Sequence, residues 1–197
     1  MQNEVIIKQM REYAEENNVP IMIDEGMNFL LNYILKNHVK RVLEIGTAIG
    51  YSAIMMCSVD PELTVDTIER DEKRYLEAIR NIKSAHLEDR IQLIYQDALD
   101  VYLEDQYDLI FIDAAKAQNQ NFFERFEDNL APHGAVITDN MSFHGMVDKN
   151  PEEIESRNVR QLVRKVNAYK EFLINHPRFH TEFYEIGDGL AVSEKLT

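Results

Sequence analysis

Three oxygen-bearing side chains follow two apolar stretches in the second half of the sequence. Asp113 follows Tyr107–Ile112, and Asp139 and Asn140 follow Ala135–Thr138. If both stretches are parallel strands, these side chains meet at the carboxyl edge of one sheet, where such folds bind ligands. Two carboxylates and an amide form an all-oxygen set that suits Mg²⁺ or Ca²⁺ better than Zn²⁺. The alternative is that the two aspartates separately cap the helices that follow them.

A lysine lies close to the first of these carboxylates. Lys116 comes three residues after Asp113, so one helical turn would bring its ammonium group near a bound cation. There it could take or hold the proton of a substrate hydroxyl. We therefore predict that Asp113 and Lys116 are catalytic. A solvated surface lysine is the commoner interpretation of such a residue taken alone.

A glycine turn, Glu44–Ser52, follows the apolar stretch Arg41–Ile45. Glycine lets a ligand approach the backbone, and the helix that follows offers free N–H groups. Glu44 could accept hydrogen bonds from an amine, which suits the amino-acid end of S-adenosylmethionine better than a pyrophosphate. Only Gly46 and Gly50 are present, so the dinucleotide fingerprint is incomplete and a nicotinamide-dependent oxidoreductase is disfavoured. The alternative is a tight turn without a ligand.

Two more strand ends carry polar side chains. Glu69 closes the stretch Leu63–Ile68 and could accept both ribose hydroxyls of a nucleoside. Gln96 and Asp97 follow Ile91–Tyr95 and could meet an adenine edge. The alternatives are a solvated acidic strand end and a helix N-cap by Asp97.

These residues need a scaffold in which strands and helices alternate. Helical patterns such as Asp71–His86 and Asn119–Leu130 separate the apolar stretches, and Tyr75, Ile79 and Ile82 share one face of the first helix. This alternation predicts an α/β fold with a doubly wound, mostly parallel sheet.

The C-terminal part of the chain follows a different pattern. A charged helix is predicted from about Glu155 to Asn175. Two strands, Phe179–Ile186 and Leu190–Ser193, follow it and are joined by the turn signal Gly187-Asp188-Gly189. We expect this hairpin to close the sheet. The polar stretch Ser142–Ile154 is predicted to be a loop.

The composition indicates one globular domain, residues 1–197. A formal net charge of −14 weighs against non-specific binding of nucleic acid. One cysteine, Cys57, excludes an internal disulfide framework. The sequence has no signal-peptide pattern and no apolar run of the ~18 residues that a membrane span needs, so we expect a cytoplasmic protein without a membrane partner.

Taken together, the motifs resemble those of the cation-dependent, catechol-type O-methyltransferase family. The resemblance runs from about Val19 to Lys195, and any one of its motifs is weak while all of them in order are specific. The motifs are VLEIGTAIGYSA (42–53), TIER (67–70), YQDAL (95–99), FIDAAK (111–116), ITDN (137–140) and IGDGLAVSEK (186–195). One departure is Gln96, where relatives often have glycine, which puts the adenine contact in doubt.

The resemblance implies a seven-stranded class I methyltransferase fold, Rossmann-like, with an antiparallel last strand. It implies Mg²⁺ or another divalent cation on Asp113, Asp139 and Asn140, and Lys116 beside the reacting hydroxyl. It also implies S-adenosylmethionine bound by a set of residues from several strand ends: Met22, Glu44, Gly46, Ser52, Glu69, Gln96, Asp97 and Asp113.

Within the family the chain is most similar to bacterial tRNA 5-hydroxyuridine methyltransferases, which form 5-methoxyuridine at the wobble position. The similarity is clearest in VPIM (19–22), FIDAAKAQNQNFF (111–123) and RNVRQLVRKVNAY (157–169). The last segment would present a basic helix face to tRNA, made of Arg157, Arg160, Arg164 and Lys165. The alternatives are a solvated face balanced by nearby glutamates, and a small catechol or caffeoyl-type substrate, which the net charge favours. We also expect a homodimer.

Overall fold

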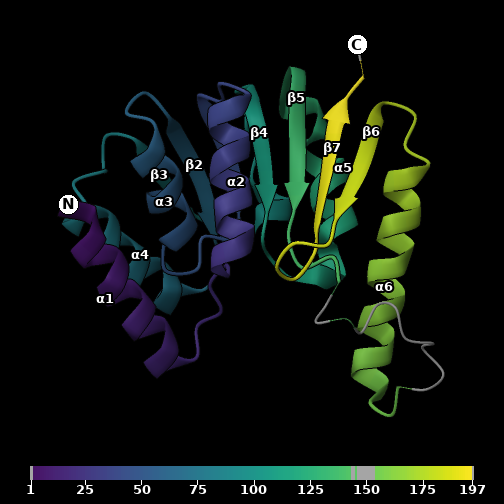
Figure 1. Cartoon of the computed structure of the whole chain (residues 1–197), viewed down its shortest axis with the longest axis horizontal. Helices are drawn as coiled ribbons and strands as arrows, with labels where there is room; N and C mark the ends of the chain where they lie inside the picture. The colour runs from purple at the N-terminus through teal and green to yellow at the C-terminus, as the bar shows by residue number, and fades with distance from the viewer. Residues whose placement is uncertain (1, 143–144, 146–153, 197) are drawn as a thin grey trace.

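The protein is described here by a computed structural model that covers residues 2–142, 145 and 154–196. Seven strands form one sheet in the order β3-β2-β1-β4-β5-β7-β6, with helices on both faces (Figure 1). Strand β7 runs antiparallel to both of its neighbours, and the other described pairings are parallel. The predicted fold class and the closing hairpin are confirmed. The strands are β1 (Arg41–Ile45), β2 (Thr64–Glu69), β3 (Ile91–Tyr95), β4 (Tyr107–Ile112), β5 (Leu130–Thr138), β6 (Phe179–Tyr184) and β7 (Leu190–Lys195).

The helices divide between the two faces of the sheet. The first four pack with one apolar cluster, and α5 and α6 pack with the other. Figure 1 shows α2 crossing in front of the sheet and α5 behind it. The α-helices are α1 (Gln2–Asn17), α2 (Asp24–Lys36), α3 (Tyr51–Val59), α4 (Glu72–Ser84), α5 (Asn119–Phe126) and α6 (Arg157–Ile174). Short 3₁₀ turns are η1 (Ala98–Asp100), η2 (Lys116–Gln118) and η3 (Glu127–Asn129). The motifs did not predict α1.

The central strands are apolar along their whole length because both of their faces are covered. In β1, Val42 and Leu43 are both fully buried, yet they belong to opposite clusters. Side chains alternate between the two faces of a strand, so a strand covered on both sides has a continuous apolar run. The same alternation decides which strand-end side chains enter the site.

The helices add one refinement and one correction to the predictions. In α4 the buried positions are Ala78 and Ile82, whereas Ile79, on the predicted shared face, is 40% exposed, so the helix packs on the sheet along a narrow stripe. Helix α5 ends at Phe126, and Leu130 begins β5 beside Tyr107 instead of ending the helix. Pairing with β4 therefore outweighs the local helical pattern at this point.

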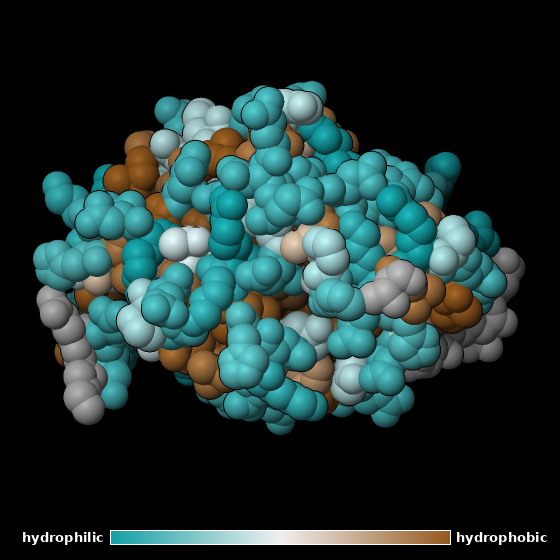
Figure 2. Space-filling model, turned by 90° about the horizontal axis from the view of Figure 1, so that it is seen from above, coloured by the Kyte–Doolittle hydropathy of each residue, from teal (hydrophilic) through white to brown (hydrophobic). Residues whose placement is uncertain are grey.

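The loop predicted at Ser142–Ile154 lies mostly outside the described residues. Among the described residues, no helix combines the length and the apolarity that spanning a membrane would require. Viewed from the amino ends of the parallel strands, the molecule is mainly hydrophilic, with hydrophobic residues in small separate areas (Figure 2).

Candidate active site

The carboxyl ends of the central strands open into one cavity of about 500 Å³. Backbone hydrogen bonds align these ends: Asp113 N donates to Ile45 O and Asp139 N donates to Ile112 O, both at 3.0 Å. The loops after β1, β2, β3, β4 and β5 therefore all face the cavity. Its volume is within the range of small-molecule sites. The sheet edge that the sequence predicted is the edge that carries the pocket.

The turn after β1 has a backbone that brings two loops into contact. Gly46 has φ +103°, and a Cβ there would lie 2.1 Å from Asp113 O. Ala48 also has positive φ, +47°, and its N–H points to Glu69. This close approach requires glycine, because any side chain at Gly46 would displace the β4 loop.

Glu69, at the end of β2, is held in one orientation by backbone donors. Its Oε2 accepts from Ala48 N at 2.8 Å, and its Oε1 accepts from Arg70 N and Asp71 N at 2.9 and 2.8 Å. The residue is 7% exposed and lines the cavity. Three of the about four lone-pair sites of the carboxylate are used in this way, so one site on Oε2 remains for a hydroxyl, and the predicted contact with both ribose hydroxyls stays a prediction.

Two residues predicted to bind the cofactor, Glu44 and Ser52, lie behind the cavity wall and are not among its lining residues. The Ser52 hydroxyl donates to Glu44 Oε1, and Thr67 Oγ1 donates to Glu44 Oε2. Burial raises the pKa of Glu44 to about 7. In this structure the two residues join β1, β2 and α3, because the alternation along β1 puts Glu44 on the same sheet face as Val42, which α3 covers.

The side chains after β3 line the cavity but are used by their own loop. Gln96 Nε2 donates to Asp100 O at 2.9 Å. Asp97 caps η1 by accepting from Leu99 N at 3.0 Å, and it also pairs with Arg70 at 2.9 Å. The N-cap interpretation of Asp97 is confirmed, and its residual lone pairs still face the cavity.

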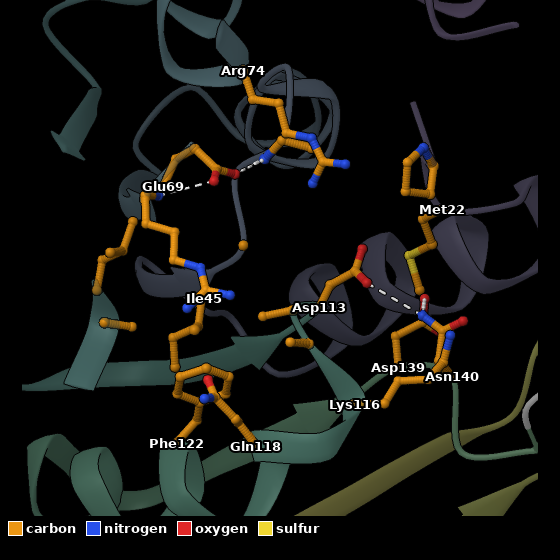
Figure 3. A pocket seen from close by; sticks show the side chains of 18 of the residues that line it. Met22, Ile45, Glu69, Arg74, Asp113, Lys116, Gln118, Phe122, Asp139 and Asn140 are labelled. Carbon is orange, nitrogen blue, oxygen red and sulfur yellow. Dashed lines mark hydrogen bonds between the residues drawn. The ribbon is translucent and has the colours of Figure 1, made fainter. Parts of the chain in front are cut away.

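Asp113, Asp139 and Asn140 converge at the other end of the cavity, as predicted (Figure 3). Asn140 Nδ2 lies 3.3 Å from Asp113 Oδ1 and 3.2 Å from Asp139 Oδ2. Burial raises the pKa of both carboxyl groups; the charge of Glu44 adds to this for Asp113, and the charge of Asp113 does so for Asp139. Asn140 has φ +65°, a left-handed backbone that asparagine tolerates.

This group fits a hard divalent cation. The half-buried Asp113 carboxylate and the buried Asp139 carboxylate lie on either side of the Asn140 amide nitrogen, and an added positive charge would relieve their repulsion. The Asn140 amide can present its oxygen as well as its nitrogen to the same point, since the two are interchangeable by rotation. The three side chains would hold the cation and leave positions for substrate oxygens. In the described part of the chain no cluster of three His, Cys, Asp or Glu side chains could hold a metal, so the amide is needed.

Lys116 begins η2 and lines the same end of the cavity, where its charge lowers the pKa values of Asp113 and Asp139.

Sequence reasoning missed a third acid, Asp188. It lies in the β6–β7 turn and faces both aspartates, whose pKa values its charge raises. Ser142 N and Ser142 Oγ donate to Asp188 O at 2.8 and 2.6 Å and fix the turn against the end of β5. The sequence feature that could have identified Asp188 is its position between Gly187 and Gly189 in the predicted turn.

The segment between α1 and α2 forms one wall of the cavity. Met22 is buried, and its side chain points toward Asn140 (Figure 3). Gly26 makes room for it, because a Cβ there would lie 2.9 Å from the Met22 methyl carbon. Arg11 of α1 pairs with Asp24 of α2 through two contacts, one of which is Nη1 donating to Oδ2 at 3.1 Å. Its guanidinium lies over the Tyr51 ring.

The predicted basic face of α6 is only partly available. Arg157, Arg164 and Lys165 are exposed, but Arg160 is half-buried and donates through Nε and Nη2 to Ile154 O at 3.1 and 2.7 Å. Arg160 therefore holds the segment that precedes the helix. Helix α6 packs against η2, the turn that begins with Lys116. The basic residues of α6 therefore lie on a helix next to this turn.

Comparison with known proteins adds independent evidence. The family model described as O-methyltransferase matches residues 1–196. A caffeoyl-CoA O-methyltransferase of Populus kitakamiensis is 25% identical over an alignment of 203 residues that covers 96% of this chain and 86% of the relative. A Staphylococcus aureus structure, provisionally named a caffeoyl-CoA O-methyltransferase, is 44% identical with a TM-score of 0.92, covering 96% of this chain and 92% of that one. A Bacillus cereus O-methyltransferase in complex with SAH (S-adenosylhomocysteine) is 24% identical with a TM-score of 0.83, covering 98% and 91%.

Proposed function

The chain belongs to the O-methyltransferase family, and on that premise we propose that it transfers the methyl group of S-adenosylmethionine to one of two neighbouring oxygens on an aromatic ring. The observation that carries this proposal is the convergence of Asp113, Asp139 and Asn140 beside Lys116, in the same cavity as Glu69. A cofactor would occupy the end at Glu69. An acceptor would meet the acidic end.

Methyl transfer by direct displacement requires no covalent bond to the protein. A hydroxyl oxygen attacks the methyl carbon, the carbon–sulfur bond breaks, and its electron pair stays on sulfur. A divalent cation, when bound by Asp113, Asp139 and Asn140, supplies positive charge that lowers the pKa of a nearby hydroxyl. Lys116 holds or takes the hydroxyl proton, and Asp188 orients a second oxygen. Most of the rate then comes from positioning of the two reacting groups in the cavity.

The acceptor that we favour is a small catechol-type or caffeoyl-type compound. Its support is the caffeoyl-CoA description of relatives that match nearly the whole chain. A catechol offers two adjacent oxygens, which suits a cation that keeps open positions. The net charge of −14 suits a small substrate better than an RNA.

The second candidate is the 5-hydroxyuridine of tRNA, and one observation favours it. The exposed cations Arg157, Arg164 and Lys165 lie on α6, whose helix packs against the turn that begins with Lys116. A 5-hydroxyuridine also carries two neighbouring oxygens, at C4 and C5. It would therefore meet the same acidic end of the cavity.

One experiment separates these possibilities and tests the cation. Methyl transfer from labelled S-adenosylmethionine is measured to a catechol, to caffeoyl-CoA and to hydroxyuridine-containing tRNA, before and after chelation. We expect transfer to be lost in chelator, restored by Mg²⁺ and absent in Asp139→Ala, which should still bind SAH. Full activity in excess chelator would contradict the cation. Preferred methylation of tRNA would replace the first candidate by the second.

A further inference from the structure

One side chain that lines the cavity has a buried polar atom without a partner in the described part of the chain. Gln118 is the last residue of η2, and its Oε1 is buried without a hydrogen bond to any described residue. Among the lining side chains that the structure describes, it is the one with such an atom. A buried polar atom left unpaired costs about 1–3 kcal/mol, so its presence needs an explanation.

The position of Gln118 is at the nucleoside end of the cavity. Figure 3 shows its side chain beside Phe122 and Ile45, on the Glu69 side and away from Asp139 and Asn140. Helix α5, which carries Phe122, packs against η1 after β3. The surrounding lining side chains are apolar, as the faces of a base require: Ile45, Ile68, Ala98 and Phe122.

The side chains that the sequence assigned to the adenine edge already have partners in the fold. Gln96 donates to Asp100 O, and Asp97 accepts from Leu99 N and from Arg70. Gln118, in contrast, offers a carboxamide that caps nothing in its own helix. It therefore has hydrogen-bonding capacity that the fold itself does not use.

A carboxamide matches adenine in one particular way. Its oxygen accepts and its nitrogen donates in one plane, while adenine presents the 6-amino donor next to the N7 acceptor. Glutamine and asparagine make this two-bond match to adenine in nucleic-acid recognition. A base with a 6-oxo group presents two acceptors on that edge and leaves the amide oxygen unpaired.

We propose that Gln118 reads the adenine of S-adenosylmethionine, accepting from its 6-amino group and donating to N7. The assignment rests on the proposed cofactor and adds the residue that makes the site specific for adenine. It also gives η2 two functions, because Lys116 at its start serves the acidic end and Gln118 at its end serves the base.

The test is the affinity for two ligands, measured by titration calorimetry. The ligands are SAH and its 6-oxo analogue, whose base is hypoxanthine. The wild-type protein should prefer SAH by about tenfold or more, as expected for one lost hydrogen bond and one unpaired group. Gln118→Met, which keeps the size of the side chain, should bring the two affinities to within about threefold.

Two further variants guard against an indirect effect. Gln118→Glu keeps the acceptor and repels a 6-oxo group, so its preference for SAH should persist or widen. Gln120→Met is the matched control, because Gln120 lies two residues away and bonds Glu124 on the surface at 3.0 Å. It should behave as the wild type. The assignment is overturned if Gln118→Met keeps the wild-type preference. A wild-type protein that binds neither ligand would instead overturn the proposed function, and the assignment with it.

Discussion

At the scale of single residues, the glutamate near the end of β1 has a structural role that its motif did not indicate. Both oxygens of Glu44 accept from hydroxyls of the fold, on Ser52 and Thr67, and its contact with the amino group of the cofactor stays a prediction. Its effect on the site is electrostatic, since its charge raises the pKa of Asp113. We therefore expect its clearest signature in the stability of the protein.

The free energy of unfolding should depend on pH through Glu44. Its pKa is 4.5 ordinarily and about 7 in the folded protein, so between these values the folded state binds the extra proton. The contribution of Glu44 to stability is thus lost as pH rises from about 4.5 to about 7. Glu44→Gln removes this dependence and should gain up to about 3 kcal/mol relative to wild type above pH 7. The free energy of unfolding of wild type and of Glu44→Gln is measured by urea unfolding between about pH 5 and 8. If the two free energies change with pH in parallel, as we expect for wild type and the exposed control Glu88→Gln, the prediction is wrong.

Gly46 should be the least replaceable glycine of the turn. An added Cβ would meet Asp113 O at 2.1 Å, and φ is +103°. Gly46→Ala should therefore lower the free energy of unfolding by about 3 kcal/mol or more, through overpacking and backbone strain. Gly145→Ala is the matched control, with φ +71° and open space around it, and should lose about 1 kcal/mol. Both free energies of unfolding are measured by urea unfolding. Equal losses in the two variants would show that backbone strain alone, and not the contact with the β4 loop, determines the cost of the substitution.

At the scale of elements, α6 carries the exposed cations on which binding of a tRNA substrate would depend. Its exposed cations Arg157 and Arg164 lie on a face that Arg160 helps to position, because Arg160 anchors the segment before the helix at Ile154 O. Replacing Arg160 would therefore disturb the helix start as well as its charge. The other two positions give a cleaner test of RNA binding.

If tRNA is the substrate, Arg157→Glu with Arg164→Glu should weaken its binding and reduce the slope of log affinity against log salt. Each lost phosphate contact should flatten this slope by about 0.7–0.9, because fewer counterions are released. Filter binding at several salt concentrations provides the slope. Lys36→Glu with Lys83→Glu, on α2 and α4 across the sheet, is the charge-matched control. An unchanged slope in the α6 variant, with catechol methylation intact, would leave α6 without a role in tRNA binding.

At the scale of the whole molecule, the cofactor should bridge elements that the sheet alone does not connect. The cavity is lined by the segment before α2 and by the loops after β1, β2, β3 and β4. A ligand that spans them binds the folded state and not the unfolded chain. Its binding free energy therefore adds to stability.

SAH at about 100 times its dissociation constant should raise the melting temperature by about 5–10 °C. The increase should persist in chelator, because Glu69 and Gly46 need no cation to hold a nucleoside. NAD should give no increase, since the turn has two glycines and not the full fingerprint. Scanning fluorimetry compares the two ligands directly. Stabilisation by NAD and not by SAH would contradict the cofactor assignment.

The sequence alone determined the sheet and the residues at its open edge. Alternating strands and helices put the carboxyl ends of parallel strands together, so Glu69, Asp113, Asp139 and Asn140 could be located from strand ends before any contact was known. The homodimer and the cytoplasmic location stay predictions.

Only the tertiary structure decided which polar groups are used by the fold and which remain for a ligand. Glu44 and Asp97 looked alike as strand-end acids, but hydroxyls on other elements occupy the first and a cap and an arginine occupy the second. Asp188 joined the acidic end through a turn that packs on Ser142, and Gln118 Oε1 has no hydrogen-bond partner among the residues that the structure describes. Periodicity fixes neighbours within one element, whereas hydrogen-bond satisfaction depends on partners far apart in the chain.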